Sequence, residues 1–207
     1  MKKRSERVVL ASMRKNWRPY MVTPLTAVFT GIALTGCSDN SSEAEIYHTL
    51  DDCISDNPSY SEQCRSAYQF ALQEAQRTAP KYQRMDDCVA EFGANGCMQS
   101  PGNNWFMPAM AGFMFARLIN NNTGYYSQPM FRSYYPGSVF YDRWVTADGY
   151  DYGRSSYRKS TVRVSKDQMK PKATQSKTIS RGGFGSSVSA KSSWSSSKSS
   201  SSKSWGG

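Results

Sequence analysis

Five cysteines have the widest chemical range of any residues in this 207-residue sequence. A thiolate can attack an electrophile, bind a soft metal such as zinc, or form a disulfide. Cys37 stands apart, at the end of an apolar stretch. The other four fall within one segment and form an even set, which is typical of disulfides in an exported protein. They are Cys53, Cys64, Cys88 and Cys97.

A duplicated motif bears on how these four cysteines pair. Residues 47–56 (YHTLDDCISD) align with residues 82–91 (YQRMDDCVAE) at a shift of 35 residues. Each copy reaches a second cysteine after a short polar loop. Repeat symmetry therefore favours Cys53–Cys64 and Cys88–Cys97 among the possible connectivities, which the sequence alone does not decide. Zinc is the alternative, although structural zinc sites usually place paired cysteines about two to four residues apart.

The first 36 residues are typical of an export signal. Basic residues precede an uncharged apolar stretch from Met21 to Gly36, which is shorter than the roughly 20 apolar residues of a membrane-spanning helix. Leu34-Thr35-Gly36 before Cys37 resembles the bacterial lipobox, in which the cysteine receives diacylglycerol. We therefore expect residues 1–36 to be a cleaved signal peptide and residues 37–42 to be a linker that begins at lipidated Cys37. An uncut signal anchor is the alternative.

Charge is distributed unevenly along the chain. The formal net charge is +10, yet residues 37–153 carry −7, whereas residues 1–36 contribute +6 and the chain from Arg154 onward contributes +11. The overall charge is therefore a poor indication of nucleic-acid binding, and we expect no nucleic-acid partner.

Ser38 rather than Asp after the lipidated cysteine is typical of lipoproteins on the periplasmic face of the outer membrane.

His48 is the one histidine, and it lies close to Asp51 and Asp52 in the sequence. A histidine beside a carboxylate could serve as acid and base for an envelope enzyme. The second copy, however, has Gln83 at the matching position, and no nucleophile accompanies the pair. The Asp pairs also lie where a helix should begin, where they complement its dipole. We therefore expect no catalytic residue, no metal and no cofactor.

The elements that position these residues are predicted to form a small, mainly α, disulfide-stapled module over residues 43–100, with α+β as the alternative. Apolar residues at three- and four-residue steps after Ser61 predict an amphipathic helix that ends at Pro80, with Ser61 as its N-cap. The mean hydropathy of −0.65 argues against one large core.

Three further segments follow the module. Residues 101–123 include the most apolar stretch, WFMPAMAGFMFARLI, and predict a short apolar helix and an Asn-rich turn; the helix either packs on the module or meets a membrane interface or partner. Residues 124–160 are rich in tyrosine, proline and glycine and predict an aromatic irregular region, with a recognition surface as the alternative. Residues 161–207 are basic and Ser-rich and predict a long disordered tail.

Several stretches of the sequence resemble the YgiB family of enterobacterial proteins. The matching stretches are Arg14-Lys15-Asn16-Trp17, Leu34 to Cys37, Glu74 to Tyr82, Asp87 to Gly93, Trp105 to Gly112, and Arg181-Gly182-Gly183-Phe184-Gly185 ahead of a Gly-Gly C-terminus. The resemblance covers nearly the whole chain. It implies no activity, because the family has none assigned.

These features together predict an exported envelope lipoprotein with a non-catalytic interaction or structural role. Its expected partners are the membrane, through the lipid on Cys37, and an unknown envelope protein or the cell wall. Binding of lipopolysaccharide or another polyanion through the basic tail is the alternative, and an envelope enzyme is a further one.

Overall fold

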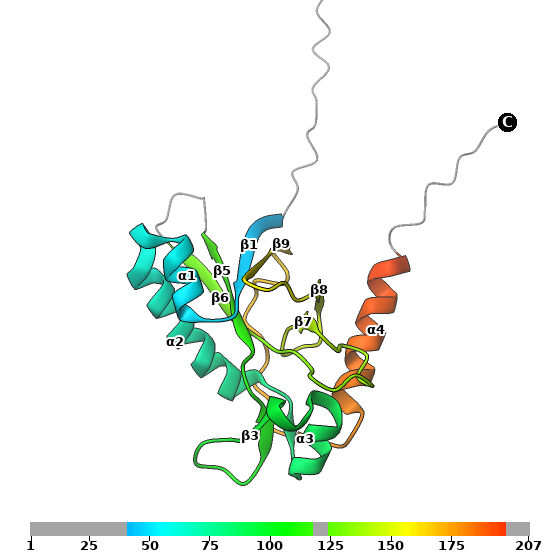
Figure 1. The fold of residues 1–207 in the computed structure, drawn as a ribbon. Helices are drawn as coiled ribbons and strands as arrows, with labels where there is room; N and C mark the ends of the chain where they lie inside the picture. Colours follow the sequence, from blue (N-terminus) through cyan, green and yellow to red (C-terminus); the bar gives the residue numbers. More distant parts are fainter. Residues whose placement is uncertain (1–40, 118–123, 198–207) are drawn as a thin grey trace, which may run out of the picture. The chain divides into compact units, whose positions relative to one another are not determined.

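The computed structural model describes residues 41–117 and 124–197, in which three of the four helices precede β3 and the strands β3 to β10 then follow one another before α4 (Figure 1). The helices are α1 (Leu50–Asp56), α2 (Ser61–Thr78), α3 (Met85–Phe92) and α4 (Gly183–Ser197), with 3-10 turns at Pro58–Tyr60 and Ala94–Gly96. The strands are β1 (Ser41–Tyr47), β2 (Lys81–Tyr82), β3 (Cys97–Gln99), β4 (Phe106–Pro108), β5 (Gly112–Arg117), β6 (Tyr125–Met130), β7 (Arg143–Val145), β8 (Asp151–Arg154), β9 (Lys159–Ser165) and β10 (Thr178–Ile179). The fold is therefore α+β with substantial sheet, and the mainly α prediction is wrong.

A four-stranded antiparallel sheet in the order β6-β5-β1-β9 forms the centre of this fold. Strand β1 pairs with β9 along its whole length, from Ser41 opposite Ser165 to Tyr47 opposite Lys159. Its pairing with β9 joins the start of the described chain to a segment more than 110 residues later in the sequence. Sequence periodicity carries no information about such a distant pairing.

The apolar segment 105–119 contributes strands β4 and β5, so the predicted short apolar helix is wrong. In β5, Phe113 and Phe115 pack in the cluster that contains α1 and α2 residues, whereas Met114 and Ala116 pack with Trp144 in another cluster. Strand β5 thus buries both faces. Side chains still alternate between the faces, but both sets are apolar, and such a run has no period that separates a buried strand from a helix.

Helices α1 and α2 contribute to the cluster that contains Phe113 and Phe115. The buried residues of α2 recur at three- and four-residue steps and include Cys64, Ala67, Ala71 and Ala75. The predicted helix after Ser61 is therefore confirmed, although Ser61 is its first residue and Tyr60 occupies the N-cap position. A disulfide between Cys53 and Cys64, with 5.9 Å between the Cα atoms, joins α1 to α2.

The second copy of the motif lies in a different part of the fold. Here α3 follows β2, which belongs to a small sheet in the order β10-β2-β4-β3. A disulfide between Cys88 and Cys97 joins α3 to β3, so both disulfides lie within their copies of the motif. Tyr82, Phe92 and Phe140 are fully buried in the core cluster around this helix.

The hairpin of β7 and β8 contributes Trp144 to the cluster that contains Met114. The Trp144 indole lies so close to β5 that a Cβ at Gly112 would be 2.8 Å from its Cη2 atom and 2.4 Å from the Tyr47 carbonyl oxygen. Only glycine leaves room for this contact, because real Cβ atoms do not approach other heavy atoms that closely. Trp144 Nε1 also donates a hydrogen bond of 3.0 Å to Ser160 Oγ.

Residues 161–165 belong to β9 and residues 178–197 include β10 and α4, so the prediction of a disordered tail over residues 161–207 is wrong for these stretches. Helix α4 is rich in serine and has no apolar stripe along its length. It forms on the body because Phe184 and Val188 enter the core, where Phe184 lies 5.4 Å from the Phe92 ring and 5.3 Å from the Phe140 ring. Packing of this kind, rather than propensity, stabilises most helices in proteins.

The predicted lipidation site, Cys37, lies outside the described residues, as do the predicted signal peptide and most of the linker. Within residues 41–117 and 124–197, no helix is both long enough and apolar enough to cross a bilayer.

Candidate functional site

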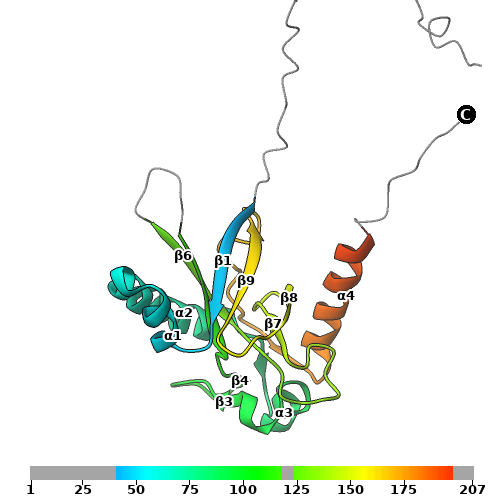
Figure 2. The same cartoon turned by 45° about the horizontal axis from the view of Figure 1, so that its top comes forward.

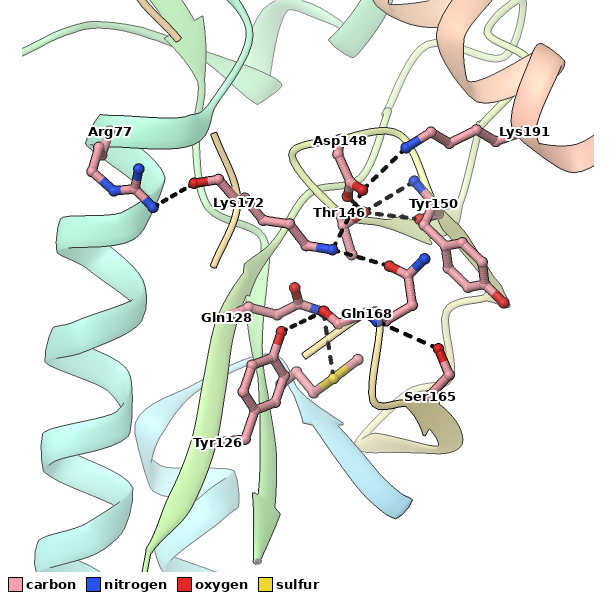
Figure 3. Close-up of polar contacts among 11 residues, drawn as sticks. Arg77, Tyr126, Gln128, Thr146, Asp148, Tyr150, Ser165, Gln168, Lys172 and Lys191 are labelled. Atoms are coloured by element: carbon pink, nitrogen blue, oxygen red, sulfur yellow. Dashed lines mark hydrogen bonds and ion pairs between the residues drawn. The ribbon is translucent and has the colours of Figure 1, made fainter. Parts of the chain in front are cut away.

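A groove lies among α2, β6 and the segment 169–172, and its volume is about 370 Å³. Ala147, between β7 and β8, also lines it, so four parts of the chain that are far apart in sequence line one cavity. Its lining includes apolar, cationic and amide side chains, among them Phe70, Arg77, Tyr125, Gln128, Met169 and Lys172. Figure 3 shows the polar side chains beside it.

The apolar lining of the groove is aromatic and partly open to solvent. Phe70 of α2 is 47% exposed, although the core-facing residues of the same helix are buried. Tyr125, Pro129 and Met169 provide further apolar surface in the lining. Complete burial of an exposed phenylalanine contributes roughly 1.5–3 kcal/mol, so a ligand that covers the exposed 47% of Phe70 would gain about half of that from apolar contact.

Arg77 holds the segment after Met169 against α2. Its guanidinium makes two hydrogen bonds to the Glu74 carboxylate, of 2.9 and 2.6 Å. It also donates to the backbone oxygen of Lys172 at 2.8 Å and to Thr174 Oγ1 at 2.6 Å. The Glu74 carboxylate raises the pKa of Arg77. This geometry keeps the guanidinium ionised and its charge paired with Glu74, and it fixes the segment after Met169 in place.

Asp148 organises the cations on the other side (Figure 3). Its carboxylate accepts from Thr146 Oγ1 at 2.5 Å, from Lys172 Nζ at 3.3 Å and from Lys191 Nζ at 3.0 Å. Burial acts to raise the pKa of Asp148, but the hydroxyl and the two ammonium groups outweigh burial and hold that pKa below its ordinary value of 3.8. Asp148 is therefore ionised at neutral pH and joins the segment around Lys172 to α4.

The polar groups of β6 remain neutral. Tyr126 donates its hydroxyl proton to the backbone oxygen of Gln168 at 2.9 Å, and burial raises its pKa well above the ordinary range. Gln128 directs its amide nitrogen at the Met114 sulfur, 3.5 Å away. These groups can hydrogen-bond a ligand but do not change protonation near neutral pH. The groove is therefore suited to binding through apolar contact and hydrogen bonds.

His48 and Asp52, the residues of the enzyme alternative, interact with different groups. His48 Nε2 lies 2.7 Å from the backbone oxygen of Ser156, and its ring centroid is 4.8 Å from that of Trp144. Asp52 accepts hydrogen bonds from the amide and hydroxyl of Thr49 and caps α1. In the described ranges, no group of three or more His, Cys, Asp or Glu side chains is arranged to hold a metal ion.

Sequence analysis did not identify the groove. One available signal was Phe70, a large apolar residue on the polar face of a predicted amphipathic helix. Arg77 and Lys172 carried no signal, because 95 residues separate them and their contact depends on the tertiary structure.

Comparisons with known proteins identify a family for this chain. A family model described as "Protein of unknown function (DUF1190)" matches residues 41–195. The chain belongs to the DUF1190 family. A UPF0441 protein from Serratia proteamaculans (strain 568) is 39% identical over 221 residues, which cover 99% of this chain and 100% of that protein. These matches confirm the resemblance to the YgiB family. No solved structure matches the chain.

The DUF1190 match begins at the first residue of β1 and ends within α4. The family region therefore coincides with the folded body, and it includes every residue of the groove. Because the family description assigns no activity, the physical properties of the groove provide the basis for a functional proposal.

Proposed function

We propose that this member of the DUF1190 family is an exported envelope lipoprotein whose body binds another envelope protein without catalysing a reaction. Export is supported by the basic and apolar character of residues 1–36, and lipidation by Leu34-Thr35-Gly36 before Cys37. The two disulfides in the body are consistent with an oxidising compartment.

The observation that carries the binding role is the composition of the groove. Its lining exposes aromatic and thioether surface, and each of its three cations, Arg77, Lys170 and Lys172, already pairs with a carboxylate of this chain. A protein segment that presents apolar side chains complements this exposed surface. We therefore take such a segment as the occupant.

The polyanion alternative is less well supported by the described part of the basic C-terminal region. Lys170 pairs with Asp167 at 2.7 Å, and both Lys172 and Lys191 pair with Asp148. These ammonium groups already interact with carboxylates of the same chain. A polyanion would have to compete with those contacts, two of which involve the partly buried Asp148.

The lipid anchor is tested by intact mass and membrane fractionation of the native protein beside the Cys37→Ser variant. We expect a native mass that corresponds to an acylated chain beginning at Cys37, and the variant should lack this modification. An uncut native chain would contradict the lipoprotein.

The groove is tested with 1-anilinonaphthalene-8-sulfonate, an anionic probe whose aromatic rings bind exposed apolar surface. Phe70→Ser should weaken binding of the probe, whereas Tyr141→Ser should not, although both side chains are 47% exposed. A photo-cross-linking residue placed at Phe70 in cells should then yield an adduct with an envelope protein, and the probe should compete with that adduct. Equal probe binding by both variants would contradict the groove as the binding site.

A further inference from the structure

The anchor and the body are separated by very little chain. Strand β1 begins at Ser41, four residues after Cys37, and its pairing with β9 begins at that residue. Four residues span at most about 14 Å when fully extended. A compact domain of about 160 residues has a radius of gyration of roughly 15 Å, so its diameter exceeds the length of this connection.

This short connection restricts which part of the body can lie near the bilayer. The start of β1 is level with the end of β9, where Ser41 lies opposite Ser165. Arg117, the last residue of β5, lies opposite Tyr125 at the start of β6. Figures 1 and 2 both show these strand ends at one end of the body and α3 with β3 at the other. We name these strand ends, together with Lys166, the anchor edge.

We infer that the anchor edge lies against the anionic lipid surface that holds the lipid on Cys37. This inference rests on the lipid anchor proposed above. It adds the orientation of the body and the chemistry of the surface that the body meets.

The charge of the anchor edge supports an anionic partner. Arg117, Arg163 and Lys166 are exposed at or next to the strand ends, and the exposed carboxylates near them are Glu43 on β1 and Asp167, which pairs with Lys170. Three cations therefore outnumber two carboxylates at the edge where β1 begins, and the connection keeps Ser41 at that edge within about 14 Å of the anchor. That distance is one to two Debye lengths at about 0.15 M salt, so attraction by anionic headgroups is only partly screened.

The test uses the acylated full chain in vesicles of phosphatidylcholine and phosphatidylglycerol. A photo-cross-linking p-benzoyl-phenylalanine replaces either Ser165, at the anchor edge, or Met98 of β3, which is 40% exposed at the other end of the body. Intact mass before irradiation establishes whether Cys37 carries its lipid. Mass after irradiation measures the yield of phospholipid adducts.

We expect the Ser165 position to give a several-fold higher yield of lipid adducts than the Met98 position. In the protein with the cross-linker at Ser165, a further Lys166→Glu substitution should lower the yield of lipid adducts. Lys177→Glu, at an exposed lysine in the segment before β10, should not lower it. Equal yields from both positions in an acylated protein would overturn the orientation and leave the proposed lipoprotein intact. An unacylated native chain would overturn both, and the first mass measurement distinguishes these two failures.

Discussion

In the first copy of the duplicated motif, Tyr47 ends β1, α1 follows, and a disulfide joins α1 to α2. In the second copy, Tyr82 ends β2, α3 follows, and a disulfide joins α3 to β3. The order of strand, helix and disulfide is the same in both. The copies differ in what they contact, because β1 is a central strand of the main sheet and β2 belongs to a small second sheet.

The two tyrosines show this difference at the level of single groups. Tyr47 donates its hydroxyl proton to Glu45 and accepts a hydrogen bond of 3.0 Å from Asn57. Tyr82 donates instead to Glu91, at the end of its own helix. Burial and these carboxylate partners raise the pKa of both phenols. Both hydroxyls therefore remain protonated donors, but only Tyr82 has a carboxylate partner that is itself buried.

The residue after each motif determines what can pack on it. Asn57 follows the first copy, is buried, and donates hydrogen bonds to the Tyr47 hydroxyl and the Cys53 backbone oxygen. Phe92 follows the second copy and packs with Phe140 and Phe184. Phe184 belongs to α4. The comparison teaches that one local framework can complete a sheet in one place and receive the C-terminal helix in another, where Phe92 and Phe140 pack against Phe184.

Glu91 adds an electrostatic contact between the second copy and α4. Backbone amides of Gly182, Phe184 and Gly185 lower the pKa of Glu91 in part, but burial is the larger influence and raises it above the ordinary value of 4.5. Its Oε1 atom has no hydrogen bond of good geometry within the described residues. Glu91 thus complements the positive end of the α4 dipole at some cost in desolvation.

Phe92→Ala should cause the largest loss among the changes that separate the two copies. Removal of a fully buried phenylalanine lowers the free energy of unfolding by roughly 3–5 kcal/mol, and here it should also expose α4 to proteolysis. The matched change, Asn57→Ala, removes hydrogen bonds and should cost about 1–3 kcal/mol without exposing α4. Urea unfolding and limited proteolysis measure both effects. Equal exposure of α4 to proteolysis in the two variants would contradict the role of Phe92 in holding α4 on the body.

Replacement of each disulfide by two serines should have nearly equal effects. The sequence separations are 11 residues for Cys53–Cys64 and 9 residues for Cys88–Cys97. Loop closure of this length contributes about 2.5–3 kcal/mol in either copy, because the contribution varies only with the logarithm of loop length. Urea unfolding of the two double variants tests the equality. A much larger loss from one pair would show that the copies differ in more than their surroundings.

Tyr82→Phe should cost more than Tyr47→Phe. The first change leaves the buried Glu91 carboxylate without its hydroxyl donor, a loss of about 1–3 kcal/mol. The second leaves Glu45, whose side chain is 28% exposed and pairs with Lys159 at 2.7 Å, and Asn57, whose Nδ2 still donates to the Cys53 backbone oxygen at 3.0 Å. Water and Lys159 therefore compensate in the first copy. Chemical unfolding at pH 7 provides the comparison, and a greater loss from Tyr47→Phe would refute this explanation.

The helix caps offer a smaller test in which the two copies should respond in opposite directions. Thr49 and Asp52 form a complete capping box on α1, whereas Arg84 at the N-cap of α3 makes no side-chain cap. Thr49→Ala should cost about 1 kcal/mol, and Arg84→Thr should recover up to a similar amount by pairing with Asp87. Thermal and urea unfolding measure both changes. A destabilising Arg84→Thr would mean that the arginine has a compensating role.

The pH dependence of stability provides the last comparison, and its effect is a slope rather than a loss. Because the folded-state pKa of Glu91 is raised, its contribution to stability is complete below about pH 4.5 and declines as pH rises toward the folded pKa. Asp148 has a lowered pKa, so its contribution is present above pH 3.8 and is lost on acidification. The free energy of unfolding of Glu91→Gln, measured across this pH range, should not decline as pH rises. That of Asp148→Asn should lack the loss of stability on acidification. An unchanged curve for Glu91→Gln would contradict the raised pKa.

Local sequence patterns predicted the features that depend on neighbouring residues. The repeat indicated both disulfide pairs, and three- and four-residue spacing indicated α2. Residues 105–119 were misassigned because β5 buries both faces, so its alternation is between two apolar sets. The region of α4 was misassigned because a Ser-rich segment has no apolar stripe, and two residues, Phe184 and Val188, provide its contact with the core.

The groove illustrates the limit of such patterns. Phe70, Tyr125 and Lys172 come from three segments, each of which has an ordinary local composition. Arg77 and Asp148 bring these segments together through contacts with residues 95 and 24 positions away in the sequence, respectively. Without the sheet register and the path of residues 166–177, no spacing rule places these side chains in one cavity.

The sequence by itself determined the repeat, the disulfide pairs favoured by it, the helix of α2 and the resemblance to a family, because each depends on residue types at short separations. Tertiary structure alone decided the pairing of β1 with β9, the strand identity of residues 112–117, the docking of α4 and the groove. The physical reason is burial. A segment's environment depends on which distant elements cover it, and that information is distributed over the whole chain.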